Sequence, residues 1–194
     1  MPRIARDTLL TLEAYAKQRE QFRARVLAHK KNRTVHLGEH VTLIFEDELT
    51  IRYQIQEMLR IEKTFDENGI QDELDAYTPL VPDGSNLKAT MMIEFEDPLL
   101  RKQQLAKLIG IEDRVYVQVD GQAPAYAIAD EDLDRENEHK TSSVHFLRFE
   151  LTPAAIAAFK GGAAVAIGID HPNYAVRLDE VAPQVQSALA QDFT

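Results

Sequence analysis

The sequence of 194 residues contains no cysteine. Disulfide bonds, zinc sites built on thiolates, iron–sulfur clusters held by the chain itself and a cysteine nucleophile are therefore excluded. A redox role for this chain would need a cofactor or a partner protein that carries the reactive group.

Long apolar runs are also absent. No stretch approaches the roughly 20 apolar residues that a bilayer-spanning helix needs. The first twenty residues, MPRIARDTLLTLEAYAKQRE, carry charges throughout and lack the continuous apolar core of a signal peptide. We expect a soluble, cytoplasmic protein that has no membrane partner.

The common catalytic and cofactor motifs are missing. The chain has no Gly-x-Ser-x-Gly, no phosphate-binding glycine-rich loop and no Gly-x-Gly-x-x-Gly before a helix. Gly161 and Gly162 follow an alanine-rich stretch and are expected to end a helix. The sequence predicts no cofactor.

Charge is distributed unevenly along the chain. The formal net charge is −10, but residues 1–33 hold nine Lys/Arg against three acids, a local balance of +6. Such a basic segment could bind nucleic acid. We favour a basic helix that lies on the acidic remainder of the same chain, because the segment has only two aromatic residues, Tyr15 and Phe22, both at apolar-face spacing. No nucleic-acid partner is predicted.

Hydrophobic periodicity predicts the fold class. Residues 87–95, 115–119 and 144–151 alternate as strands with one buried face, whereas residues 48–65 follow helical spacing. Helices and hairpins mixed in this order indicate an α+β fold with a mostly antiparallel sheet, flanking helices and a long N-terminal helix.

We expect a single domain over residues 1–194. Its expected parts are a basic helix at 7–31, a core at 34–128, an acidic loop at 129–142 and a C-terminal part at 143–194. The loop is expected to be solvated, because it has almost no apolar residues and carries six acids: Asp130, Glu131, Asp132, Asp134, Glu136 and Glu138.

The helix expected at 48–65 carries the first candidate site. Its apolar positions predict a buried face made by Ile51, Ile55, Met58 and Leu59, and its other side is polar with a four-residue period through Glu48, Arg52, Gln56 and Arg60.

The charged residues of this helix could hold an anionic ligand between guanidinium groups or dock on a partner. The alternative is a helix with surface ion pairs, each worth only about 0.3–0.5 kcal/mol. The candidate binding residues are Arg52, Glu57, Arg60 and Glu62.

Three short patterns are weak candidates for metal ligation. His36 and His40 are four residues apart, Glu136 and His139 form one Glu-x-x-His, and Asp170-His171 ends an apolar strand. Turns explain these patterns equally well, because Gly38 separates the first pair and Pro172 follows the last. No metal site is predicted.

The strand expected at 144–151 carries a polar residue on each face. His145 shares a face with Leu147 and Phe149, and Arg148 lies on the opposite face. Hydrogen bonding within the core is the default interpretation. A pocket lined by these two residues and His171 is the alternative.

Four segments together resemble a known family. They are QIQEMLRIE at 54–62, LKATMMIEF at 87–95, VHFLRFEL at 144–151 and GIDHPNY at 168–174. They resemble an uncharacterised bacterial family, catalogued as a domain of unknown function, whose genes often neighbour rubrerythrin and an iron–sulfur oxidoreductase with heterodisulfide-reductase-like cysteine motifs. The resemblance implies an accessory role in peroxide or redox stress, with those two proteins as partners, and it carries over no catalytic residue.

Two functional hypotheses follow from the sequence. In the first, the chain is a non-enzymatic accessory protein of a redox system that docks through the helix at 48–65 and the acidic loop. In the second, it is a small enzyme or a ligand- or metal-binding protein. The pocket of the second hypothesis would be lined by Arg52, Glu57, Arg60, His145, Arg148 and His171. Convergence of these side chains in space would favour the second hypothesis.

Overall fold

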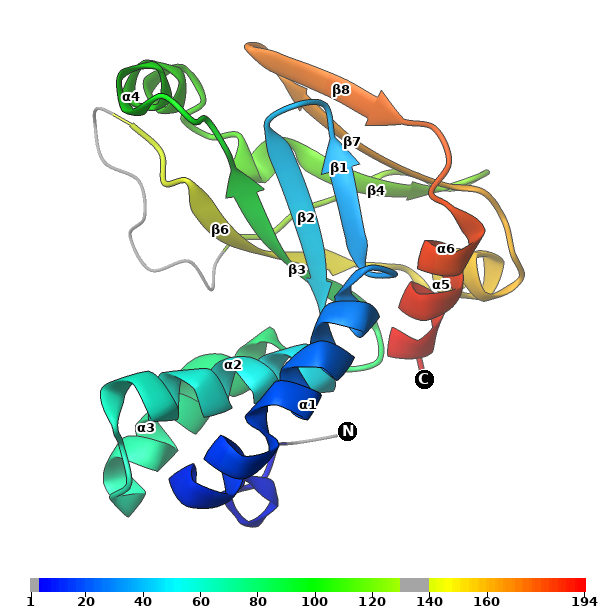
Figure 1. Ribbon diagram of the computed structural model, residues 1–194. Helices are drawn as coiled ribbons and strands as arrows, with labels where there is room; N and C mark the ends of the chain where they lie inside the picture. The colour runs from blue at the N-terminus through cyan, green and yellow to red at the C-terminus, as the bar shows by residue number, and fades with distance from the viewer. Residues whose placement is uncertain (1–3, 130–139) are drawn as a thin grey trace.

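The computed structural model describes residues 4–129 and 140–194. Two four-stranded antiparallel sheets lie together, and three helices form a separate layer at one end of them (Figure 1). This arrangement confirms the α+β class and the predominance of antiparallel pairing.

The first sheet has the strand order β1-β2-β3-β6. Its strands are β1 Thr34–Leu37, β2 Val41–Glu46, β3 Asn86–Ile93 and β6 Val144–Glu150. The expected hairpin joins β1 to β2, with Leu37 opposite Val41. Gly38 in its turn has φ +72°, a conformation in which a side chain would be strained.

The second sheet has the order β5-β4-β7-β8. Its strands are β4 Val115–Val119, β5 Ala125–Tyr126, β7 Val165–His171 and β8 Tyr174–Leu178. After β5 the chain crosses to the first sheet, where Ile128 and Arg148 exchange backbone hydrogen bonds of 2.8 and 2.9 Å. The two sheets are thus joined through the backbone at this corner.

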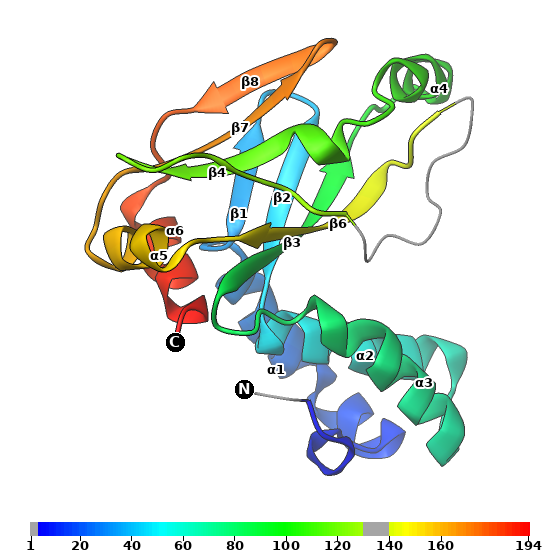
Figure 2. The same cartoon turned by 180° about the vertical axis from the view of Figure 1, so that it is seen from behind.

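Both sheets contribute to one apolar core. Leu43, Met91 and Phe149 of the first sheet and Val117 and Ile167 of the second are all buried in it. Figure 2 shows the sheets from behind, with β4 and β7 crossing the strands of the first sheet. Alternation of apolar and polar residues along these strands puts the apolar face toward the other sheet.

A hydroxyl group also ties the two sheets together at the turn between β1 and β2. The Tyr174 hydroxyl at the start of β8 donates to the carbonyl oxygen of Leu37 at 2.6 Å and accepts from the amide of His40 at 3.2 Å. The hairpin turn is therefore held against β8.

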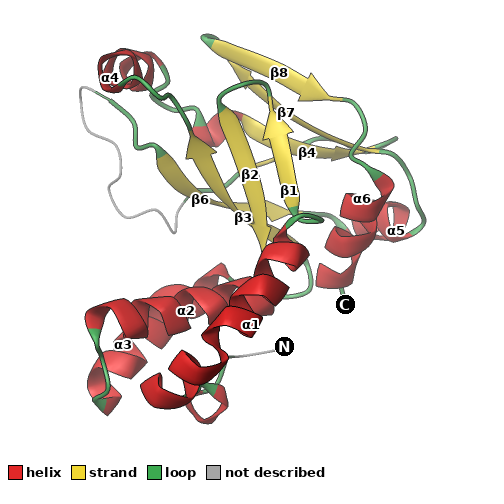
Figure 3. Ribbon diagram, in the orientation of Figure 1, coloured by secondary structure: helices red, strands yellow, loops and turns green. Residues whose placement is uncertain are grey.

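The helical layer has a core of its own. Helix α2 packs against α1 and α3, with two short 3-10 turns beside them, and Figure 3 shows these helices gathered below the strands. The elements are η1 Arg6–Thr8, α1 Leu12–Lys30, α2 Glu48–Glu62, α3 Glu67–Tyr77 and η2 Thr78–Leu80. Ile51, Ile55 and Leu59 are buried here, as expected, whereas Met58 is half-buried.

The remaining helices lie around the sheets. Helix α4 stands at one end of the first sheet, and α5 and α6 lie together near the C-terminus (Figure 1). Their bounds, with those of two 3-10 turns, are α4 Pro98–Lys107, η3 Glu112–Arg114, α5 Pro153–Lys160, α6 Pro183–Leu189 and η4 Ala190–Asp192.

Two helix boundaries differ from those expected. Helix α1 begins at Leu12 and not near Asp7, because the Thr11 side chain accepts from the amide of Ala14 at 3.2 Å and caps the helix there. Helix α2 ends at Glu62 and not at Phe65, because Lys63 takes a left-handed conformation with φ 57°.

Most of the acidic loop expected at 129–142 lies outside the described residues. Within the described parts of the chain, no helix is long and apolar enough to cross a membrane.

Candidate functional site

The predicted site residues lie in three separate parts of the structure. Arg52, Glu57 and Arg60 belong to the helical layer, whereas His145 and Arg148 lie on β6 and His171 ends β7. Each is engaged in contacts with its own surroundings, as the next paragraphs describe. The six side chains do not converge.

The polar row of α2 is a contact surface with the N-terminal segment. Arg52 Nη1 donates to the Thr8 carbonyl oxygen at 2.8 Å and to its hydroxyl at 2.7 Å. Gln56 is 1% exposed, and its side chain accepts from the amide of Leu10 at 2.7 Å and donates to its carbonyl oxygen at 3.3 Å. A carboxamide can bond to both the N–H and the C=O of one residue. The polar residues of this row therefore hold the N-terminal segment against α2.

Glu57 is the centre of a second set of contacts between α1 and α2. It accepts from the Tyr15 hydroxyl at 2.7 Å, from Arg19 at 2.7 and 2.9 Å and from Arg60 at 3.2 Å. The Arg19 guanidinium is the main cause that lowers the pKa of Glu57 to about 2, against the opposing effect of burial. The carboxylate is thus charged at neutral pH. Glu62, at the end of the helix, is exposed.

His145 is a core residue, 1% exposed. Its Nε2 lies 2.9 Å from the Thr141 hydroxyl and 3.1 Å from the Ser142 carbonyl oxygen, with the Glu112 carboxylate at 3.9 Å. Arg148, on the opposite face of β6, forms an ion pair of 2.6 Å with Glu150. The contacts of His145 match the default interpretation of hydrogen bonding within the core, whereas the Arg148–Glu150 pair is partly exposed.

His171 and Asp170, two of the weak metal candidates, are also used locally. The Nδ1 of His171 accepts from the Asn173 amide at 3.1 Å, so its Nε2 carries the proton and donates to the Ile109 carbonyl oxygen at 3.1 Å. Asp170 accepts from the Tyr126 hydroxyl at 2.6 Å. The described residues contain no group of three or more His, Asp or Glu side chains placed to hold a metal ion. The Glu136–His139 pair lies outside them.

His36 and His40 point to different partners across the hairpin. His36 Nδ1 lies 3.2 Å from the Thr42 hydroxyl, whereas His40 Nδ1 donates to the Glu94 carbonyl oxygen at 3.1 Å. The His40 ring stacks on Phe95 with centroids 4.1 Å apart. His40 and Phe95 both line a hollow in the surface.

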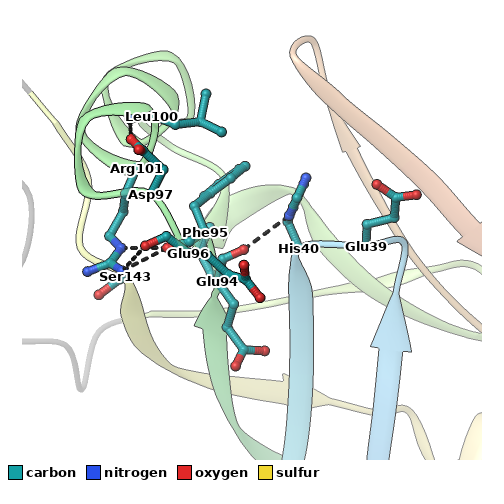
Figure 4. A pocket seen from close by; sticks show the side chains of 10 residues that line it. Glu39, His40, Glu94, Phe95, Glu96, Asp97, Leu100, Arg101 and Ser143 are labelled. Carbon is teal, nitrogen blue, oxygen red and sulfur yellow. Dashed lines mark hydrogen bonds between the residues drawn. The ribbon is translucent and has the colours of Figure 1, made fainter.

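The hollow has a volume of about 850 Å³ and is open to solvent (Figure 4). Four segments separated in sequence surround it, namely the β1–β2 turn, the end of β3 with the loop after it, the start of α4 and Ser143 just before β6. Its lining consists of Glu39, His40, Ile93, Glu94, Phe95, Glu96, Asp97, Leu100, Arg101 and Ser143. We call it the acidic hollow.

Carboxylates dominate the charge of the acidic hollow. Glu39, Glu94, Glu96 and Asp97 are all exposed there. Arg101 does not offset them by direct pairing, because its guanidinium donates to the carbonyl oxygen of Phe95 at 2.9 and 2.7 Å and to that of Glu96 at 3.3 Å. These bonds fix the loop that follows β3. The hollow consequently attracts cations.

Apolar side chains flank the carboxylates. Leu99 is 75% exposed and Leu100 is 42% exposed, both in the first turn of α4. Asp97 accepts from the Leu100 amide at 2.7 Å and so caps that turn. These leucines add exposed apolar surface beside the carboxylates.

The Thr42 hydroxyl bonds to one carboxylate of the acidic hollow. Thr42 donates its proton to Glu94 Oε2 at 2.9 Å, so His36 acts toward it as a donor and not as a base. Thr42 is also 6% exposed. The exposed carboxylates of the hollow can bind a charged group, whereas the Thr42 hydroxyl is buried.

A buried charged cluster, which the sequence interpretation missed, joins the helical layer to the sheets. Arg33 is 1% exposed and donates to Asp192 at 2.5 Å and to the carbonyl oxygens of Phe45 and Glu46 at 2.8 and 3.1 Å. Burial raises the pKa of Asp192 to about 6, although Arg33 opposes this. Arg33 belongs to the basic run of residues 1–33, and nothing local in the sequence distinguishes it from the exposed cations there.

The protein is therefore an α+β protein with two antiparallel sheets, a helical layer and an open acidic hollow. A family model described as "Protein of unknown function (DUF3501)" matches residues 3–193, so the chain belongs to that family. A crystal structure of a novel protein of unknown function from Burkholderia pseudomallei K96243 is similar over 100% of both chains, with 61% sequence identity and a TM-score of 0.95. No curated protein matches the chain. The resemblance to a family of unknown function with a bacterial member is thereby confirmed.

Proposed function

We propose that this chain is a non-enzymatic accessory protein that docks on a partner protein through the acidic hollow. The observation that carries the proposal is the combination of four exposed carboxylates with the exposed side chain of Leu100 in the lining of one open hollow, beside Leu99, which is exposed next to it in the chain. A surface of this kind offers both charge attraction and apolar contact area.

The arrangement of the other ionisable residues supports a role without turnover. Glu57 is neutralised by Arg19 and Arg60, His145 is hydrogen-bonded inside the core, and both nitrogens of His171 are bonded to the backbone. General acid–base catalysis needs such groups within hydrogen-bond reach of a substrate. Here they serve packing and chain positioning.

The chemistry of the hollow specifies the partner surface. Glu39, Glu94, Glu96 and Asp97 call for Lys or Arg side chains, and the two leucines call for an apolar residue next to them. We therefore propose that the occupant is a basic segment of a protein with an aliphatic or aromatic residue among its cations. Opposite charges of this kind raise the encounter rate more than they raise affinity.

The setting we propose is a bacterial redox or oxidative-stress system. The family resemblance implies an iron–sulfur oxidoreductase and rubrerythrin as partners, and the absence of cysteine leaves the redox group to such a partner. Docking through α2, the first surface considered, is less well supported, because Arg52 and Gln56 are occupied by the N-terminal segment.

The test is a binding measurement with two matched double variants. Glu39→Lys with Glu96→Lys reverses charge in the hollow, and Glu20→Lys with Glu180→Lys makes the same change in net charge at exposed acids elsewhere. We expect the first pair to weaken binding to the purified iron–sulfur oxidoreductase by about tenfold or more in biolayer interferometry. The second pair should have a much smaller effect, and both should melt like the wild type.

Two results would contradict the proposal. Equal losses in the two double variants would indicate a general effect of net charge and not a docking site. Stoichiometric iron, zinc or an organic cofactor in protein purified without an affinity tag would favour the alternative, a small enzyme or a ligand- or metal-binding protein.

A further inference from the structure

A second cavity lies between α1 and α2. Its volume is about 350 Å³, near the lower end of ligand pockets. One wall is the α1 face that carries Gln18, Gln21, Phe22 and Arg25, and the other is formed largely by the N-terminal segment with Arg52.

The charge of this cavity is opposite to that of the chain. Two arginines line it and no carboxylate does, although the chain carries a net charge of −10. It also opens on the helix of the basic segment, whose local balance is +6 over residues 1–33. Such a potential concentrates small anions at the cavity.

Arg25 is the cation available to a ligand. In the parts of the chain that the structure describes, its guanidinium has no carboxylate or other hydrogen-bond acceptor, and its CZ atom lies 4.8 Å from the centroid of the Phe22 ring. Phe22 is itself held by edge contacts with Tyr15 and Tyr53, with centroids 6.0 and 5.8 Å apart. A guanidinium over a fixed ring is pre-organised, so little side-chain entropy is lost when it binds an anion.

Arg52 forms the opposite wall and is oriented by its own bonds. Its Nε donates to Glu48 at 2.7 Å, Nη2 bonds to the same carboxylate, and Nη1 holds Thr8. Because Glu48 neutralises Arg52, Arg52 contributes mainly to the wall of the cavity. The positive charge available to a ligand comes from Arg25. The amides of Gln18 and Gln21, on the same face of α1 as Arg25, add hydrogen-bond donors.

We propose that this cavity binds a small organic anion with a carboxylate or phosphate head group. The head group bonds to Arg25 and the Gln21 amide, and an apolar or aromatic body packs on Phe22 and Leu10, which also lines the cavity. The volume admits a small metabolite. Carboxylate and phosphate groups are both oxyanions, and both can accept two parallel hydrogen bonds from a guanidinium group.

The experiment is an NMR titration of the full chain with benzoate, phenyl phosphate and inorganic phosphate. Saturable shifts of the Arg25 Nε–H and the Gln18 and Gln21 amides are expected with at least one aromatic anion, at concentrations up to about 10 mM. Weaker binding of inorganic phosphate than of phenyl phosphate would assign part of the affinity to the apolar wall. The carboxylate and phosphate arms identify the preferred head group.

Variants separate this site from general attraction to a basic helix. Arg25→Gln should weaken binding by about tenfold or more, and Arg25→Lys should restore part of it, because charge is kept and the fork is lost. The matched control is Arg23→Gln, an exposed arginine of the same helix that does not line the cavity; its effect should be below about twofold. Equal losses in Arg25→Gln and Arg23→Gln, or no saturation with any probe, would overturn the proposal.

Discussion

Arg33 and Asp192 are 159 residues apart in sequence, and their side chains meet in a hydrogen-bonded ion pair of 2.5 Å. Arg33 follows α1, and Asp192 closes the last 3-10 turn of the chain. The same guanidinium lies 3.5 Å from Asp47, which caps α2 and accepts a hydrogen bond from His29 at 2.5 Å. One buried cation therefore connects the C-terminus, the first sheet and the helical layer.

Loss of the cation in this cluster should be costly. We expect Arg33→Met to lower the free energy of unfolding by about 3–5 kcal/mol, because the largely buried Asp192 carboxylate would lose its cation and the half-buried Asp47 would keep only His29. Urea denaturation followed by circular dichroism measures the change. The control is Arg23→Met at an exposed position of α1, for which a change below about 0.5 kcal/mol is expected. Similar small changes in both variants would show that the cluster contributes little to stability.

The Asp192 carboxyl should titrate near neutral pH. Its pKa is raised from 3.8 to about 6, chiefly by burial, so the native state holds a proton that the unfolded state has already released between these values. This group's contribution to stability is therefore present below pH 4 and is lost as the pH rises through 6. A carbon-13 NMR titration of the carboxyl group measures the midpoint. A midpoint below 4 would mean that Arg33 outweighs burial.

Glu57 should act in the opposite sense. Its pKa falls from 4.5 to about 2, chiefly through the hydrogen bonds from Arg19, so its contribution to stability is present above pH 4.5 and is lost as the pH falls toward 2. We expect Glu57→Gln to cost about 1–3 kcal/mol at pH 7, allowing for solvent screening of Arg19 and Arg60. The cost should shrink as the pH approaches 2. A cost that does not change with pH would rule out the ion pairs as its source.

The buried face of α2 gives a packing prediction. Leu59 is 2% exposed, and Leu59→Ala should cost about 2–5 kcal/mol through lost burial and the cavity left behind. Ile61→Ala on the same helix is the matched control, because Ile61 is 60% exposed. Chemical denaturation of both variants compares the two sides of the helix. A loss below half a kilocalorie for Leu59→Ala would place the core on another face.

Strands and caps could be predicted from the sequence because their causes are local. Alternation along residues 87–95 and 144–151 follows from the two faces of a strand, and Asp97 followed by Pro98 begins a helix through bonds to its own first turn. The antiparallel α+β class follows from the order of these elements.

The candidate site could not be predicted in the same way, because its parts come from distant segments. The acidic hollow needs the β1–β2 turn, the end of β3 and the start of α4 in one place, and no spacing in the sequence encodes that meeting. The sequence shows the polar row through Arg52 and Gln56 but not what covers it, because a buried glutamine looks like a surface residue until its backbone partner, Leu10, is known. Burial of Arg33 depends in the same way on the C-terminus.

Hydrogen–deuterium exchange on the complex with the iron–sulfur oxidoreductase tests the proposed docking most directly. The account predicts slower exchange on binding in residues 38–41 and 93–101, which surround the acidic hollow, with residues 48–77 of the helical layer unchanged. The double variant Glu39→Lys with Glu96→Lys should lose this protection. Protection confined to residues 48–77, or no protection in either region at saturating partner, would contradict docking through the acidic hollow.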